Sequence, residues 1–242
     1  MEREGIPLYS LESRRPVSQF DVLGISLPYE QLYTNVLHLF MLSGIPFRAT
    51  ERLDGEFPLV VAGGHAAYNP EPMAEFVDVF LLGEGEEAIV EIAQTVHAWR
   101  DKVSGLPHSQ ADRRLHRLDL LRELADLDGM YVPMFYSVDY HADGRVSSVY
   151  ATDSAVSVPV LKRIVKKLPP PLTKFIVPFV DIVHNRAAIE IMRGCTRGCR
   201  FCHAGMVTRP VRERDVGEIT AAVGEMIAST GFEELALLSL SS

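Results

Sequence analysis

The sequence contains only three cysteines and one tryptophan in 242 residues, and it contains no long apolar run. Because a membrane-spanning helix needs about 18 or more apolar residues in a row, we expect no transmembrane helix and no membrane partner. The first residues also lack the basic-then-apolar pattern of a secretory signal peptide. Few, clustered cysteines without an export signal are typical of a reducing compartment. The sequence therefore predicts a cytoplasmic protein without disulfides.

Positive charge is also scarce. The chain has 24 basic against 32 acidic residues, which gives a net charge of −8. This balance argues against a protein that coats nucleic acid over a broad surface. The apolar fraction of 47% is ordinary for a globular chain, and the length allows one large domain or two small ones.

All three cysteines lie within eight positions, in the CxxxCxxC pattern of Cys195, Cys199 and Cys202. Three thiolates on one short loop form a chelate, and cysteine thiolates hold iron–sulfur clusters. Three ligands on a four-iron cluster leave one iron open to bind a small molecule. The pattern therefore favours a [4Fe-4S] cluster over a closed structural zinc site, which needs four ligands.

Zinc is an alternative for the same loop, with His203 as the fourth ligand. Structural zinc ligands usually come as two separated pairs, and the sequence has no second cysteine pair. A third interpretation treats the cysteines as inert core residues. Their arginine and glycine neighbours argue against it, because such a loop is not core material.

Six arginines surround the cysteines and are opposed only by Glu213. They are Arg193, Arg197, Arg200, Arg209, Arg212 and Arg214. A basic region around thiolates in an acidic protein suits an anionic ligand such as a substrate carboxylate or a phosphate. The alternative is a solvated loop whose charge serves no ligand.

Short apolar strands that alternate with helices predict a parallel α/β sheet in the N-terminal half. The expected strands are residues 20–27, 59–62 and 76–82. The second strand leads into Gly63 and Gly64. These glycines form either a tight turn approached by the tail of a ligand or a tight turn alone.

The middle of the chain predicts an inserted module. A helix to about residue 100 precedes a polar break and a second helix at 112–127. Residues 131–140 and 145–151 alternate like the two strands of a hairpin. Three prolines at 169–171 can be neither helix nor central strand. We therefore expect a sheet domain over 1–105, a helix-and-hairpin insertion over 106–171, and a third part over 172–242.

In the C-terminal part, a strand at 187–192 precedes the cysteine loop, and a strand at 235–240 follows a helix. Asp215 caps that helix, with Glu218 in the spacing of a capping box, and Gly231 ends it. Strand, loop, helix and strand make one βαβ unit, which alone cannot cover a sheet. We therefore expect the sequence to be cut short at its C-terminus.

The cysteine loop, placed after a strand and with aromatic Phe201 before the last cysteine, resembles the radical S-adenosylmethionine (radical SAM) superfamily. The resemblance implies that Cys195, Cys199 and Cys202 ligate a [4Fe-4S] cluster whose fourth iron binds S-adenosylmethionine. It also implies an external one-electron donor and reductive cleavage of S-adenosylmethionine to a 5′-deoxyadenosyl radical. Phe201 would lie near the adenine.

The strand-to-loop placement also resembles the first units of the superfamily's partial (βα) barrel, whose active sites lie at the carboxyl ends of the strands. Residues 187–192 would form its first strand and residues 235–240 its second. Ser239 and Ser241 would then lie in the loop that helps to hold the amino group of S-adenosylmethionine. The later strands would be missing from this chain, so we expect the fragment to be inactive alone.

Residues 21–87 resemble the later part of a cobalamin-binding-type domain, in the stretches 22–27, 60–65 and 78–86. The resemblance implies a partial Rossmann-like sheet, with Gly63 and Gly64 next to a cofactor and with cobalamin as a further cofactor. The cobalt-ligating DxHxxG motif of some relatives is not found, so we expect the chain to begin inside that domain. The whole sequence looks most like an uncharacterised bacterial subfamily of these two-domain proteins.

The resemblance predicts a radical SAM enzyme of unknown substrate, with RNA and protein among the candidate partners. The alternative is a non-catalytic iron–sulfur or zinc module that binds RNA or protein through its arginine-rich loop. RNA binding that weakens with salt and persists without iron would favour the alternative.

Overall fold

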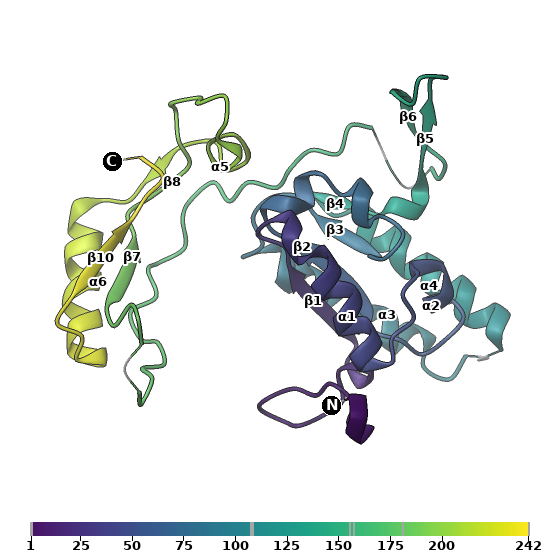
Figure 1. Cartoon of the computed structure of the whole chain (residues 1–242), viewed down its shortest axis with the longest axis horizontal. Coiled ribbons are helices and arrows are strands. Elements are labelled where there is room, and N and C mark those ends of the chain that lie inside the picture. Colours follow the sequence, from purple (N-terminus) through teal and green to yellow (C-terminus); the bar gives the residue numbers. More distant parts are fainter. Residues whose placement is uncertain (1, 107–108, 155, 157, 181, 242) are drawn as a thin grey trace. The chain divides into compact units, whose positions relative to one another are not determined.

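The computed structural model describes residues 2–106, 109–154, 156, 158–180 and 182–241. The chain divides into two compact units, Met1–Ile164 and Val165–Ser242 (Figure 1). No helix in the described ranges is both long enough and apolar enough to cross a membrane.

The first unit contains helices and strands that alternate along most of its length. Its helices are α1 (Tyr33–Ser43), α2 (Ala49–Arg52), α3 (Ala88–Val103) and α4 (Gln110–Ala125). Its strands are β1 (Val22–Ser26), β2 (Leu59–Gly63), β3 (Val79–Leu81), β4 (Met130–Tyr131), β5 (Tyr136–Tyr140) and β6 (Val146–Ala151). Short 3-10 turns lie between them at Glu2–Glu4, Val17–Gln19, Glu30–Leu32, His65–Tyr68, Glu71–Met73 and Pro133–Phe135.

Four strands form one sheet in the order β1-β2-β3-β4. The strands β1, β2 and β3 run parallel, with Val22 opposite Leu59 and Val61 opposite Val79. The last strand, β4, joins β3 in the antiparallel direction. Parallel neighbours need a crossover connection, and α1 with α2 supplies it between β1 and β2. The α/β class expected from the sequence is confirmed.

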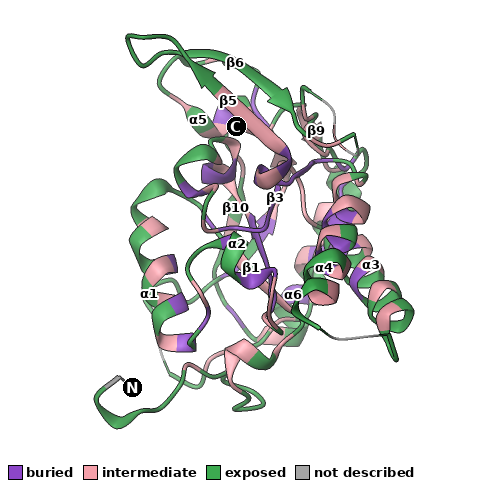
Figure 2. Cartoon of the chain, turned by 90° about the vertical axis from the view of Figure 1, so that its right-hand side faces the viewer, coloured by how far each residue is buried: buried purple, intermediate pink, exposed green. Residues whose placement is uncertain are grey.

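Both faces of this sheet are covered by helices. Successive residues of a strand point to opposite faces, so the two faces can be followed along β2. Leu59 and Val61 pack in one core with residues of α3 and α4, whereas Val60 and Ala62 pack in a second core with α1. Figure 2 shows these three helices buried along one side and exposed along the other. The continuous apolar run of β2 is therefore explained by burial on both faces.

Helix α4 belongs to the first of these cores. Its Leu120, Leu121 and Leu124 are fully buried in the same cluster as residues of β2 and β3. A capping box begins the helix, because Ser109 Oγ accepts the Asp112 N–H at 3.3 Å and the Asp112 carboxylate accepts the Ser109 N–H at 3.2 Å. By its packing, the helix that the sequence placed in an insertion is part of the first unit. The three-part division of the chain stays a prediction.

Strands β5 and β6 form a separate antiparallel hairpin. The prediction of one strand over 131–140 was wrong in its first half. Tyr131 lies in β4 opposite Phe80 of the main sheet, and Pro133–Phe135 turns before β5 begins. Pro133 has no backbone N–H to continue a strand ladder, so it separates the two strands.

The second unit holds the cysteines. Its helices are α5 (His203–Val207) and α6 (Val216–Thr230), and its strands are β7 (Ala187–Glu190), β8 (Met192–Arg193), β9 (Arg212–Glu213) and β10 (Leu235–Leu238). The strands β7 and β10 pair in parallel, and β8 pairs with β9 antiparallel. Ile189 of β7 and Met226 of α6 are nearly fully buried in one small core.

Helix α6 begins and ends where the sequence predicts. The Asp215 carboxylate accepts the N–H groups of Gly217 at 2.7 Å and Glu218 at 3.2 Å. Gly231 ends the helix in the left-handed conformation, with φ of 72°. The Glu218 side chain bonds to Arg214 at 3.3 Å, so the cap works through Asp215.

A buried ion cluster ties the sheet to the loops of the first unit. Asp78, just before β3, accepts from Arg52 Nη2 at 2.9 Å, from Arg117 Nη2 at 3.1 Å and from the Val60 N–H at 2.8 Å. The side chains of Arg52, Asp78 and Arg117 are 0%, 1% and 8% exposed. One carboxylate therefore serves two buried guanidinium groups.

Replacing Asp78 with alanine should lower the free energy of unfolding by about 3–5 kcal/mol, because both buried arginines lose their counter-charge. Urea unfolding of the whole chain measures this loss. The matched control is Glu75→Ala, which breaks an exposed pair with Arg48 and should cost less than about 1 kcal/mol. Equal losses in the two variants would contradict the buried cluster.

Candidate metal centre

The cysteine loop is closed by the pairing of two very short strands. Strand β8 leads into it and β9 follows it, with Arg193 opposite Arg212. The loop between them carries all three cysteines and the short helix α5. The pairing of β8 with β9 holds the two ends of the loop together without a bound ligand.

Gly194, the first residue after β8, lies where no side chain would fit. Its φ is 89°, and a Cβ there would come within 2.5 Å of the Pro210 carbonyl oxygen and 3.0 Å of the Thr208 carbonyl oxygen. Glycine is therefore required by both the backbone conformation and the close approach of the returning chain.

Two of the three cysteine sulfurs accept backbone hydrogen bonds. The Arg197 N–H donates to Cys195 Sγ at 3.4 Å, and the Gly205 N–H donates to Cys202 Sγ at 3.3 Å. All three cysteines are free thiols; Cys195 is buried, Cys202 is half-buried and Cys199 is exposed. Cysteine sulfur binds metal as the thiolate, and these N–H groups are directed at two of the sulfurs that would do so.

The side chains of Cys195 and Cys202 both lie next to Gly205. A Cβ on Gly205 would lie 3.4 Å from Cys202 Sγ and 3.8 Å from Cys195 Cβ, so both side chains border the space that its missing side chain leaves open. Cys199 joins this group through its backbone, since its carbonyl accepts the Cys202 N–H at 3.0 Å. Among the described residues, no three His, Cys, Asp or Glu side chains lie close enough together to hold a metal ion. The full ligand set therefore stays a prediction.

Most of the predicted arginine cluster serves the loop itself. Arg212 donates to three carbonyl oxygens, those of Val165 at 2.6 Å, Pro210 at 3.1 Å and Thr208 at 3.3 Å. Arg209 donates to the carbonyl of Gly205 at 3.2 Å.

Glu190, at the end of β7, binds two more arginines of the cluster. Arg193 forms two hydrogen bonds with its carboxylate at 2.9 and 3.0 Å. Arg214 donates to its carbonyl oxygen at 2.7 Å. Four of the six arginines thus bind the chain's own backbone or carboxylates.

The structure places the three predicted S-adenosylmethionine contacts in the same unit as the cysteines. Ser241 accepts a hydrogen bond from Arg197 Nε at 3.4 Å, which links the segment after β10 to the cysteine loop. Ser239 is half-buried in that segment. Phe201 is 93% exposed between two cysteines. Their roles stay predictions.

In the first unit, the predicted cofactor contact Gly63 ends β2, and Gly64 follows it. Gly64 has φ of 105°, and a Cβ there would lie 2.7 Å from the Leu27 carbonyl oxygen. The Ala66 N–H also donates to that oxygen, at 2.9 Å. The glycine turn is thus packed against the chain that follows β1, and packing alone accounts for Gly64.

The carboxyl end of β3 is covered by Arg163. Its N–H donates to the Leu82 carbonyl at 2.8 Å, and its carbonyl accepts the Glu84 N–H at 3.2 Å. Side chains at Gly83 or Gly129 would collide with it, because a Cβ would lie 2.2 Å from Arg163 O or 2.9 Å from Arg163 Cβ. The backbone of Arg163 therefore packs directly against Gly83 and Gly129, where a larger residue would not fit.

The Arg163 side chain strengthens this anchor. Its guanidinium binds both carboxylate oxygens of Glu91 at 2.5 and 2.6 Å and Glu87 at 3.1 Å. These hydrogen bonds lower the pKa of the Glu91 carboxyl, against the effect of burial. Glu87, at the N-cap of α3, and Glu91, in its first turn, thus bind another part of the same chain.

A family model described as radical SAM proteins, N-terminal, matches residues 1–133, more than half of the chain. The chain belongs to the radical SAM proteins. The uncharacterized protein MJ0966 of Methanocaldococcus jannaschii is 24% identical over 241 residues, which cover 97% of this chain and 41% of that protein. This radical SAM chain therefore spans about two-fifths of the length of that relative.

The donor chemistry of the cysteine loop fits what the radical SAM family implies in general, a [4Fe-4S] cluster and S-adenosylmethionine. The supporting observations are three thiols on one closed loop, two sulfur-directed N–H groups, and the approach of Cys195 and Cys202 to Gly205. Hydrogen bonds to sulfur are among the features by which proteins tune such clusters.

Cobalamin has no such support. In open α/β sheets a ligand binds outside the carboxyl ends of the strands. In this radical SAM protein, Arg163 and the Gly64 turn occupy that edge at β3 and β2. The residues present do not fit a cobalamin.

Sequence reasoning missed the Arg163 anchor. The available signal was a pair of glycines, Gly83 shortly after β3 and Gly129 just before β4, together with Glu87 and Glu91 at the start of α3. Their partner, Arg163, is distant in the sequence, and no motif around it marks its role.

Substituting Gly83 with alanine should displace Arg163, because the new Cβ would meet its backbone and because φ of 121° suits glycine alone. We expect a loss of about 1–3 kcal/mol in the free energy of unfolding and faster amide exchange at Arg163 and Glu84. Gly85→Ala in the same loop is the control, since its Cβ would make only an ordinary contact. Unchanged exchange at Arg163 in the Gly83 variant would refute the anchor.

Proposed function

We propose that this chain carries the cluster-binding region of a radical SAM enzyme, with Cys195, Cys199 and Cys202 as the three ligands of a [4Fe-4S] cluster. The observation that carries the proposal is the closed loop between β8 and β9, in which the CxxxCxxC pattern comes with N–H donors to sulfur. When bound, such a cluster supplies an electron for the reductive cleavage of S-adenosylmethionine.

The chain's own residues would bind and orient these groups. The cysteines bind iron as thiolates, and the Arg197 and Gly205 N–H groups stabilise the negative charge on sulfur. Ser241, held near the loop by Arg197, offers a hydroxyl for the amino group of S-adenosylmethionine. Exposed Phe201 offers an aromatic surface for the adenine.

The alternative function, an RNA- or protein-binding module built on the arginine cluster, has less support. Arg193, Arg209, Arg212 and Arg214 already bind groups of the chain itself. A guanidinium held by carbonyl and carboxylate oxygens has fewer donors left for a phosphate backbone. The substrate of the proposed enzyme is unknown, with RNA and protein as candidate classes.

Anaerobic reconstitution of the chain with iron and sulfide tests the proposal. The chain should take up about four irons and show visible charge-transfer absorption. Serine at any one of the three cysteine positions should remove most of the iron, because a hydroxyl is a poor substitute for a thiolate ligand. Iron and sulfide assays measure the outcome.

The matched control is Thr196→Ala, an exposed position of the same loop that supplies no ligand. It should keep the iron content of the unchanged chain. Uptake of zinc but not iron would defeat the proposal, and so would a serine variant that keeps the iron content of the unchanged chain.

A further inference from the structure

A pocket of about 830 Å³ opens at the amino edge of the first unit's sheet, away from the Arg163 anchor. Its strand side is formed by residues just before β1 and β2, including Asp21 and Phe57. Its helix side is formed by the last turns of α3 and the first half of α4. The volume is within the range of small-molecule sites, about 300–1,000 Å³.

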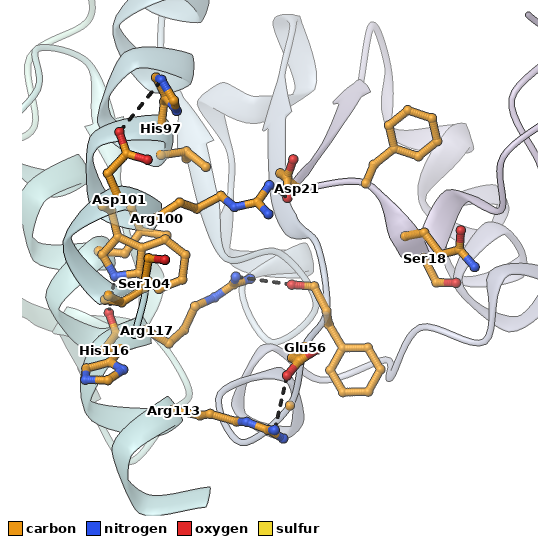
Figure 3. A pocket seen from close by; sticks show the side chains of 18 of the residues that line it. Ser18, Asp21, Glu56, His97, Arg100, Asp101, Ser104, Arg113, His116 and Arg117 are labelled. Carbon is orange, nitrogen blue, oxygen red and sulfur yellow. Dashed lines mark hydrogen bonds and ion pairs between the residues drawn. The ribbon is translucent and has the colours of Figure 1, made fainter. Parts of the chain in front are cut away.

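Arginines from the two helices cross this pocket. Figure 3 shows Arg100, Arg113 and Arg117 reaching from α3 and α4 toward the strand side. Arg100 is paired with Asp21, and Arg113 with Glu56 at 3.1 Å. The remaining carboxylate of the lining, Asp101, faces His97 at 3.9 Å. Each carboxylate of the pocket therefore already has a basic partner.

The back wall carries positive charge that these carboxylates do not balance. Arg117 lines the pocket and shares its only described carboxylate partner, Asp78, with the fully buried Arg52. Burial and the neighbouring Arg52 charge lower the pKa of Arg117. A buried charge without its own counter-ion is costly, so an anion in the adjoining pocket would stabilise it.

One more arginine, Arg15, lines the same pocket without an anionic partner among the described residues. Arg15 donates to the Gln19 carbonyl at 2.6 Å and lies over the Phe20 ring at 5.3 Å, both neutral groups. In the described part of the chain, the pocket thus has an arginine without a counter-ion, Arg15, as well as the shared positive charge of its back wall.

We propose that this pocket binds a small phosphate-bearing anion, either inorganic phosphate or a phosphate monoester. The charged donors are all guanidinium groups, whose planar forks match phosphate oxygens and stay charged at any physiological pH. The pocket is larger than one phosphate group, and Phe57 and Trp99 in its lining give an organic portion apolar surfaces to contact. The pocket's lining includes no residue of the cysteine loop, so binding should not require iron.

Thermal unfolding and titration calorimetry of the whole chain test this site, with inorganic phosphate and adenosine 5′-monophosphate as probes at constant ionic strength. Binding to the folded state should raise the melting temperature as either probe is added. Arg15→Gln and Arg113→Gln should each weaken binding about tenfold, because each removes a charge-assisted donor. Both side chains are partly exposed, so these variants should fold even if Arg117 variants do not.

The matched control is Arg114→Gln, the neighbour of Arg113 on α4, which pairs with Asp54 and does not line the pocket. It should bind both probes as the unchanged chain does. No shift with either probe overturns the proposal. So does a loss in Arg114→Gln equal to that in Arg113→Gln, because that would mean a general effect of surface charge.

Discussion

Guanidinium groups that donate to backbone carbonyl oxygens hold the loops of both units in place. Arg52 donates to three such oxygens in the first unit, and Arg212 donates to three in the second. Only five of the 24 basic residues of the chain are lysine. The preference is physically reasonable, because a planar fork with five donors can join several carbonyls at once and an ammonium group cannot do so with the same geometry.

The basic region around the cysteines therefore has a structural role in the loop. Most of these arginines donate to the chain itself, and their donors fix the path of the loop. Arg212 ties the end of the loop to Val165, the first residue of the second unit, while Gly194 lets the two ends of the loop approach closely. Contacts within the chain therefore hold the two ends of the loop that carries the three thiols.

The parts of the fold set by local pattern could be predicted from the sequence. The apolar run at 59–62 predicted a short strand of a parallel sheet, which the structure has as β2. Asp215 and Gly231 marked the ends of α6, because capping depends on residues close in sequence. The strand break at Pro133 was missed because alternation continued across it.

Contacts between distant residues could not be predicted. Asp78 looked like one more residue of a strand, and only the fold brings it to Arg52 and Arg117. Arg163 likewise gave no signal that it would cover the carboxyl end of β3. For the candidate metal centre, spacing identified the three cysteines, whereas the donors to their sulfurs came only from the structure.

Mössbauer spectroscopy of the reconstituted chain tests the central claim most directly. Three cysteine ligands on a four-iron cluster predict one iron site that differs from the other three and that alone changes when S-adenosylmethionine is added. Four equivalent irons that ignore S-adenosylmethionine would contradict the account, because they would mean that the cluster has a fourth protein ligand and no open iron.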